Sequence, residues 1–313
     1  MAPGSDPLAP WLAERLGVAM VERRSVSGGC IHQAWCLRMA DGGRLFAKTN
    51  HSTCLALLEA EADGLQALQT VARKIPAKQD AATTLVIPAP LALAVVGDQA
   101  VLVLEWLELG SGAGSKTSDG AKQWRAFGQA LAALHRHSLE TASSGYGWNR
   151  DNYIGAGAQP NGWCSDWGRF FVERRLTPQL DWLNRNGAAL RGSDELLRRV
   201  PDWLAGHDTQ PCLVHGDLWS GNAALTRDGA NALFDPAVYR GDREVDLAMA
   251  QLFGGFPQSF FQGYEQEWPL PSGHQDRVSL YNLYHLLNHA NLFGGSYQQQ
   301  AQVCLDRLLR TLL

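Results

Sequence analysis

The chain has 313 residues, of which 45% are hydrophobic and 19% charged. This composition is typical of a folded protein with a sizeable core and excludes disorder throughout. The net charge is −4 and no run of Lys or Arg is longer than two residues, so nucleic acid is not an expected partner. No stretch approaches the length of a membrane span and the first residues lack an apolar signal core, so we expect no membrane association and a cytoplasmic location.

Six scattered cysteines form no C-x-x-C pair, which argues against a zinc site or a disulfide framework and favours a reducing compartment.

The first hundred residues predict a mostly antiparallel sheet with one inserted helix. Short β-rich runs separated by turns of small residues indicate strands, and an Ala-, Leu- and Glu-rich stretch has the apolar spacing of a helix. The expected strands are 20–26, 31–39, 44–49, 91–96 and 100–107, the helix is 53–70, and a polar loop is expected at 71–90.

A Gly/Ser-rich stretch at 110–120 ends this pattern, and the remaining chain is mainly helical. The expected helices are 121–138, 167–184, 193–206, 278–293 and 296–313. The exception is 212–236, where short apolar runs around a turn at 227–230 predict a β-hairpin. The sequence therefore predicts an α+β, two-lobed architecture, with a small antiparallel-sheet lobe at 1–107, a larger helical lobe at 108–313 and a hinge at about 104–110.

The segment with the clearest chemistry is His215-Gly216-Asp217 with Asn222 five residues after Asp217, followed by Asp235. Phosphoryl transfer from ATP needs a group that accepts the proton of the attacking hydroxyl and oxygen ligands for magnesium. Asp217 suits the role of base, and Asn222 and Asp235 suit that of magnesium ligands. Taken singly, Asp217 could instead cap a helix and Asp235 could open a turn.

Two upstream features fit the same chemistry. Lys48 lies among apolar neighbours in an expected strand, and a half-buried lysine needs an acidic partner. Glu61 on the following helix is the preferred partner because its spacing to Leu65 and Leu68 turns that face inward, and Glu59 is the competing candidate. The turn formed by Ser27, Gly28, Gly29 and Cys30 joins two strands, and its small residues would let backbone N–H groups approach phosphates.

The thiol of Cys30 would lie beside these backbone amides, which favour a thiolate. This position suggests a redox-sensitive residue, and even a homodimer linked through Cys30, although a small residue tolerated in a turn explains it equally well. We expect a monomer otherwise. His135 and His137 fall on opposite sides of one helix and are expected at the surface.

Almost the whole chain resembles the fructosamine kinase (ketosamine-3-kinase) family, which shares the protein-kinase-like fold with aminoglycoside phosphotransferases and choline kinases. The H-G-D-x-x-x-x-N pattern alone would identify only that broad group. SGGCIHQAW (27–35) is among the matching segments, and the more specific resemblance is carried by HGDLWSGN (215–222) together with FDPA (234–237), LFGGF (252–256) and HLLNHANLFGGSY (285–297).

This resemblance implies ATP-dependent phosphorylation of the 3-hydroxyl of a ketosamine, the adduct of a sugar and an amine, whose phosphorylated form then breaks down. It places Lys48 on the ATP phosphates with Glu61 as its partner, and the backbones of Glu105 and Leu107 on adenine. Near the acceptor we expect five side chains to contact the substrate, which are Trp148, Asp151, Asn152, Asp166 and Trp219. For the three polar residues among them, a capping or turn role is the alternative. The loop at 73–85 is longer than usual for the family.

Two alternatives remain open. The chain could be another small-molecule kinase of the same group, acting on an aminoglycoside or an amino alcohol. It could also be a nucleotide-binding pseudokinase with a regulatory role, but such proteins lose one of the Lys, Asp, Asn and Asp set, and this chain keeps all four.

Overall fold

The computed structural model describes residues 6–27, 31–76, 84–110, 118–141 and 145–311. Its N-terminal part is an antiparallel five-stranded sheet in the order β1-β2-β3-β6-β5, as the sequence predicts. The strands are β1 (Met20–Ser25), β2 (Gln33–Met39), β3 (Arg44–His51), β5 (Pro90–Val96) and β6 (Gln99–Glu105). The register pairs Ala34 of β2 with Lys48 of β3, and Lys48 with Leu102 of β6, so Lys48 lies on a central strand.

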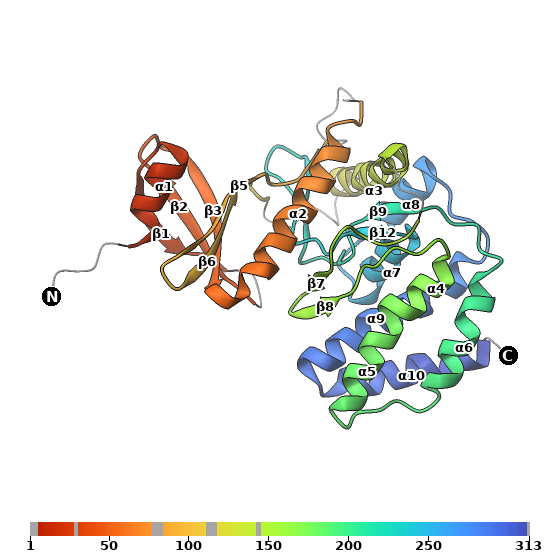
Figure 1. Cartoon of the computed structure of the whole chain (residues 1–313). Coiled ribbons are helices and arrows are strands. Elements are labelled where there is room, and N and C mark those ends of the chain that lie inside the picture. The colour runs from red at the N-terminus through yellow and green to blue at the C-terminus, as the bar shows by residue number, and fades with distance from the viewer. Residues whose placement is uncertain (1–5, 28–30, 77–83, 111–117, 142–144, 312–313) are drawn as a thin grey trace.

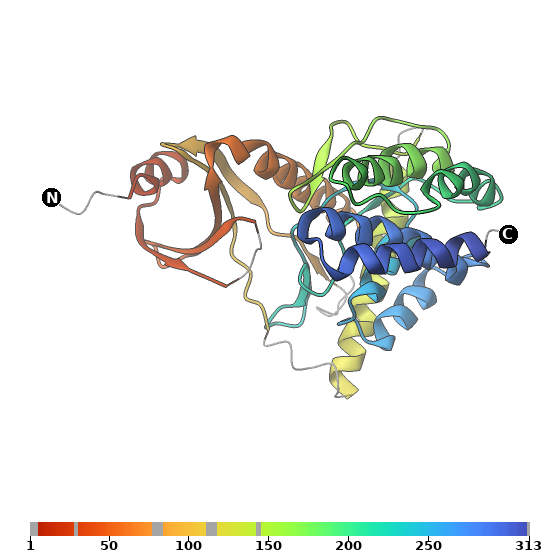
Figure 2. The ribbon, with the colours of Figure 1, turned by 90° about the horizontal axis from the view of Figure 1, so that it is seen from below.

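Each face of this sheet is covered by a helix. Helix α1 (Leu8–Leu16), which the sequence analysis did not identify, buries Leu8 and Leu12 against Leu37 and Val101. Helix α2 (Leu55–Ala72) is the predicted inserted helix, and a short 3-10 turn at Ser52–Cys54 leads into it. Figure 1 shows α2 running from the sheet towards the helical part of the molecule, and Figure 2 shows the same relation from below.

Helix α2 joins the two parts because it packs on both. Leu58 and Leu65 of α2 share one buried cluster with Leu102 of β6 and with Phe127 and Phe260 of the helical region. Gly64 permits a close approach, since a Cβ at this position would lie 3.1 Å from the side chain of Pro236. The helix that carries Glu61 is therefore held against the segment that carries Asp235.

The C-terminal part is mainly helical, as predicted, and a second large buried cluster of apolar residues forms its interior. Two of its helices, α7 and α8, are additions to the sequence prediction. The helices are α3 (Ser118–Ser138), α4 (Trp167–Phe171), α5 (Thr177–Arg185), α6 (Ser193–Leu204), α7 (Glu244–Leu252), α8 (Gln258–Glu267), α9 (His274–Phe293) and α10 (Ser296–Thr311). None of the helices in the described ranges combines the length and apolar character needed to cross a bilayer.

Local details differ from the sequence prediction at three places. The helix expected at 167–184 is interrupted by a π-helical turn at Val172–Leu176. The polar loop expected at 71–90 contains a short strand, β4 (Leu85–Val86), which pairs in parallel with β11 (Asn231–Leu233). The expected hairpin at 212–236 is correct only for β10 (Ala223–Leu225) and β11, because β9 (Cys212–Val214) pairs with β12 (Tyr239–Gly241) instead.

A second small hairpin, β7 (Asn152–Ile154) with β8 (Gly157–Gln159), lies beside α2 in Figure 1. It comes from a segment for which the sequence analysis predicted no regular structure.

Candidate active site

Three charged side chains from distant parts of the sequence meet at the junction of the sheet and the helical region. Lys48 Nζ lies 2.7 Å from Glu61 Oε1 on α2 and 2.5 Å from Asp235 Oδ1. The ammonium is buried, with a side-chain exposure of 7%, whereas the Asp235 side chain is 35% exposed. Glu59, the competing candidate, forms an ion pair with Arg150 near the surface instead.

This arrangement keeps Lys48 charged. Burial alone would lower the pKa of the Lys48 ammonium, but the carboxylates of Asp235 and Glu61 outweigh it and raise that pKa above its ordinary value. Burial raises the pKa of Glu61 to about 7 although Lys48 opposes the shift. Of Lys48 and Glu61, Lys48 is the group that holds the proton, because its ammonium also contacts a second carboxylate, that of Asp235.

Asp217 lies on the loop that follows β9, and this loop is packed tightly against the segment after Asp235. Gly216 adopts a left-handed φ of 80°, and a Cβ there would lie 2.0 Å from the carbonyl oxygen of Ala237. In the same contact the Ala237 N–H donates to the His215 carbonyl at 2.9 Å. Glycine is therefore required at 216 for both conformation and space.

Asn222 connects Asp217 with Asp235. Its Nδ2 donates to Asp217 Oδ2 at 3.0 Å and to the Asp217 carbonyl at 2.9 Å, and lies 3.3 Å from the Asp235 carbonyl. Asp235 itself is held in the left-handed region, with φ of 56°, a conformation rarely adopted by residues other than glycine. Burial raises the pKa of Asp217 to about 7 despite the hydrogen bond from Asn222, which suits a carboxylate that must accept a proton near neutral pH.

A buried carboxylate below the loop is essential to its shape, and the sequence analysis missed it. Asp246 of α7 accepts hydrogen bonds from the backbone N–H groups of His215 at 2.7 Å and Gly216 at 2.8 Å, and His135 Nε2 lies 3.1 Å from it. Burial would raise the pKa of Asp246, but the hydrogen bond and charge of His135 bring it below the ordinary value. The expectation that His135 lies at the surface is wrong, because this imidazole is fully buried between Asp246 and Tyr264.

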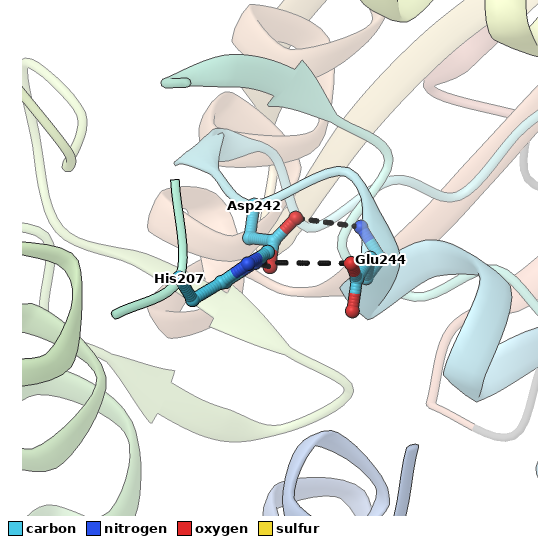
Figure 3. A group of neighbouring side chains, drawn as sticks. All are labelled: His207, Asp242 and Glu244. Carbon is cyan, nitrogen blue, oxygen red and sulfur yellow. Dashed lines mark hydrogen bonds and ion pairs between the residues drawn. The ribbon is translucent and has the colours of Figure 1, made fainter. Parts of the chain in front are cut away.

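The first turn of α7 is fixed by a second group of ionisable side chains, of which Figure 3 shows His207, Asp242 and Glu244. Asp242 accepts hydrogen bonds from His207 Nε2 and from the Tyr281 hydroxyl, both at 2.6 Å. Glu244 forms a two-point ion pair with Arg277 of α9, at 2.8 and 2.7 Å. The group anchors the helix that carries Asp246, and protein donors are hydrogen-bonded to its acidic oxygens.

Of the other residues expected at a nucleotide site, the structure describes Ser27, Glu105 and Leu107. Ser27 is exposed at the end of the described part of the first turn, and Gly28, Gly29 and Cys30 lie outside the described residues. Glu105 ends β6, and its N–H donates to the Ala89 carbonyl at 3.0 Å. Leu107 follows two residues later, where the chain leaves the sheet.

Trp219 lies on the Asp217 loop and is 36% exposed. Its indole covers Gly221, where a Cβ would come within 2.3 Å of the ring. An aromatic face is thus available to solvent two residues from Asp217.

The remaining side chains expected at the acceptor have partners within the protein. Trp148 Nε1 donates to Asp63 Oδ2 of α2 at 2.7 Å, and Asn152 is buried and donates to the Val238 carbonyl at 2.7 Å. Asp151 accepts from the Asn161 N–H, and Asp166 caps α4 by accepting from the Arg169 N–H. The two aspartates thus make the local turn and capping contacts that were the alternative to substrate binding.

The donor set fits a magnesium ion. One ammonium and three carboxylates, those of Glu61, Asp217 and Asp235, give the group a net charge of −2 when all are ionised. The Asp235 carboxylate and the amide oxygen of Asn222 are hard oxygen ligands of the kind that Mg²⁺ prefers. Fold and site together therefore define a kinase-like phosphotransferase.

Comparisons with known proteins agree with this class. The family model described as fructosamine kinase matches residues 7–311. A "Probable ketoamine kinase" of Synechocystis is 45% identical over 290 residues, covering 92% of this chain and 90% of that protein. The chloroplastic protein-ribulosamine 3-kinase of rice is 33% identical, covering 99% of this chain and 85% of that protein.

Solved structures give the same result. A "Putative fructosamine-3-kinase" from Haemophilus somnus superposes with a TM-score of 0.82 at 27% identity, covering 96% of each chain. An aminoglycoside phosphotransferase, with a TM-score of 0.61 at 17% identity over 98% of this chain and 99% of that one, shares the fold. The chain belongs to the fructosamine kinase family, whose members are phosphotransferases with an alcohol group as acceptor.

Proposed function

We propose that this protein transfers the γ-phosphoryl group of ATP to the 3-hydroxyl of ketosamines, free or attached to proteins, and so initiates removal of the sugar. The observation that carries the proposal is the meeting of Lys48, Glu61, Asp217, Asn222 and Asp235 at one site. Ribulosamines, fructosamines and erythrulosamines are the candidate acceptors, as the family membership suggests.

Each residue takes a role that follows from its contacts. Asp217 accepts the proton of the attacking hydroxyl, because burial gives its carboxyl a pKa of about 7. Lys48 binds the phosphates, and Glu61 orients its ammonium. When bound, Mg²⁺ would neutralise the charge that develops on the phosphates, and Asn222 and Asp235 would hold it.

The nucleotide would occupy the junction between the sheet and the helical region. In this proposal residues 1–107 form the nucleotide-binding lobe and 108–313 the substrate lobe, with the hinge at about 104–110. The backbones of Glu105 and Leu107 would meet adenine, and the turn at 27–30 would cover the phosphates.

The acceptor would lie against Trp219, whose ring is partly exposed two residues after Asp217 on the same loop. From residue 108 onward Asp and Glu exceed Lys and Arg by only three, 21 to 18. A polycationic aminoglycoside needs many carboxylates for its ammonium groups, whereas an aromatic face with a few polar groups suits a neutral sugar carrying one amine. This balance favours a ketosamine.

A panel of acceptors tests the proposal. ADP release would be measured with synthetic ribulose- and fructose-lysine and erythrulose adducts beside kanamycin and choline. We expect kcat/KM on the best ketosamine to exceed that on kanamycin by at least about tenfold, or about 1.4 kcal/mol of transition-state binding. Equal rates on kanamycin, or activity on no ketosamine, would assign the protein to another branch of the same kinase group.

Two further predictions concern the cytoplasmic location of the protein and the redox sensitivity of Cys30, with or without a homodimer linked through it. The second is tested by treating wild type and Cys30→Ala with mild peroxide and comparing their activity and their mobility on non-reducing gels. Equal sensitivity of the two proteins would dismiss it.

A further inference from the structure

Residues 147–161 form a segment whose polar side chains are not explained by the chemistry above. The β7–β8 hairpin occupies its centre, and Asn152, Gln159 and Asn161 are all buried, with exposures of 4%, 0% and 0%. Buried amides are costly unless they are hydrogen-bonded, so their partners show what the segment does.

One end of the segment binds helix α2. The Trp148 indole N–H donates to Asp63 Oδ2 at 2.7 Å, a short hydrogen bond to an acidic side chain. Asp63 is two residues from Glu61, so on a helix the two side chains point in nearly opposite directions. Helix α2 is therefore held from both sides, by Lys48 through Glu61 and by Trp148 through Asp63.

The β7–β8 hairpin binds the chain directly after Asp235. Asn152 Nδ2 donates to the Val238 carbonyl at 2.7 Å, and Gln159 Nε2 donates to the Ala237 carbonyl at 3.0 Å. Two successive carbonyls beyond Asp235 and Pro236 are thus fixed by side chains of one hairpin. This matters because Asp235 adopts a left-handed φ, which the surroundings must impose.

The amides are themselves held by a fully buried arginine. Asn161 Nδ2 donates to Asn152 Oδ1 at 2.6 Å, and Arg175 donates to Asn161 Oδ1 at 2.6 Å. Arg175 lies in the π-helical turn, and its guanidinium is stacked 3.8 Å from the centre of the Tyr239 ring. A network in which the amides are paired in this way is rigid.

We propose that residues 147–161 are a positioning element that sets Glu61 and Asp235 at the correct separation around Lys48. The segment binds the helix that carries Glu61 and the chain between β11 and β12 that carries Asp235, and Gly64 lets this chain contact α2 at Pro236. The segment thereby holds Lys48 and Glu61 at the distance of an ion pair. This inference rests on the proposed role of Lys48 as the phosphate-binding residue.

Nucleotide affinity, measured without any acceptor, tests it. We would determine the Kd of Mg·AMP-PNP by calorimetry for Trp148→Phe, which keeps the ring and loses the donor, and for Asp63→Leu, which loses the acceptor. Each Kd should rise by about tenfold, the effect of one hydrogen bond to a charged partner. Asp63→Asn, which retains an acceptor oxygen, should recover most of the affinity.

Two controls separate positioning from general damage. Arg169→Gln breaks an exposed ion pair with Glu173, outside residues 147–161, and should change Kd by less than about twofold. Trp203→Phe makes the same chemical change on α6, which packs on α4 and α10, and should also have little effect.

The decisive comparison is a double-mutant cycle with Glu61→Gln. If Trp148 acts through Glu61, Trp148→Phe should change Kd by less than about twofold once the Lys48–Glu61 ion pair is gone. An equal loss of affinity in both backgrounds, or a lower Tm with an unchanged Kd, would overturn the proposal. Failure of the wild type to bind Mg·AMP-PNP would overturn both this inference and the proposed function, whereas binding without activity on any ketosamine would overturn only the proposed substrate.

Discussion

Lys48 Nζ lies 2.5 Å from Asp235 Oδ1, although the two residues are 187 positions apart in the sequence. The contact joins the sheet to the helical region at the point where the proposed reaction takes place. The ammonium is shared between Asp235 and Glu61. The same contact that organises the site therefore contributes to the stability of the fold.

Replacing Lys48 with methionine tests this double role. Lys48→Met leaves Glu61 and Asp235 facing each other without a cation and should lower the free energy of unfolding. The loss should be smaller than the about 3–5 kcal/mol typical of breaking a fully buried pair, because Asp235 is 35% exposed. Urea unfolding at pH 7.5 would measure it, and Lys48→Met with Glu61→Leu should recover part of the loss. An unchanged midpoint would contradict the account.

Asp246 should control turnover without touching substrate. Asp246→Ala leaves the backbone N–H groups of His215 and Gly216 without their acceptor, so the Asp217 loop should shift. A misplacement of about 1 Å lowers kcat by roughly 10²-fold, and we expect a fall of that order with a much smaller change in the Kd of Mg·AMP-PNP. Steady-state kinetics and calorimetry on the same preparation would show the split, with Asp194→Ala, an exposed change on α6, as the control. Equal changes in both constants would point to general unfolding instead.

Asp217 should make the wild type less stable at high pH. Its carboxyl has a pKa of about 7 in the folded protein against an ordinary value of 3.8. An acid whose pKa is raised by folding favours the folded state while protonated, so its contribution is lost as the pH rises from about 4 through 7. Asp217→Asn carries no such proton, so its Tm relative to wild type should increase across this range and then level off. Thermal denaturation with EDTA and without nucleotide would measure this, and a constant difference from pH 4 to 8 would contradict the raised pKa.

Asp235 should be required for magnesium rather than for the proton transfer. Asp235→Asn removes one negative charge from the site and should weaken magnesium-dependent nucleotide binding, so that more Mg²⁺ is needed for half-maximal activity. A titration with Mg²⁺ at saturating ATP would show the shift. A wild-type magnesium requirement in Asp235→Asn would contradict the assignment of Asp235 as a magnesium ligand.

The sequence alone predicts features that depend on neighbouring residues. The strands around Lys48 follow from short β-rich runs separated by turns of small residues. Glu61 follows from its helical spacing to Leu65 and Leu68, with Glu59 as the competing candidate. The H-G-D-x-x-x-x-N pattern brings Asp217 and Asn222 together because they share one short loop.

Features that depend on distant partners could not be predicted in this way. Asp246 binds backbone N–H groups about 30 residues earlier in the chain, and backbone groups leave no signal in the amino-acid sequence. The burial of His135 depends on Asp246 and Tyr264, which its own helix does not reveal. The pairing of β9 with β12 joins strands about 25 residues apart, whereas the sequence favours a hairpin with the nearer strand β10.

The central claim is that Asp217 is the base in phosphoryl transfer to a ketosamine hydroxyl, and its most direct test is the turnover of Asp217→Asn. The measurement is kcat with the best ketosamine at saturating Mg·ATP, together with the Kd of Mg·AMP-PNP. The account predicts that kcat falls by roughly 10²–10⁴-fold, the usual contribution of a positioned base, while the nucleotide affinity stays close to that of wild type. Near-normal turnover of Asp217→Asn would contradict it.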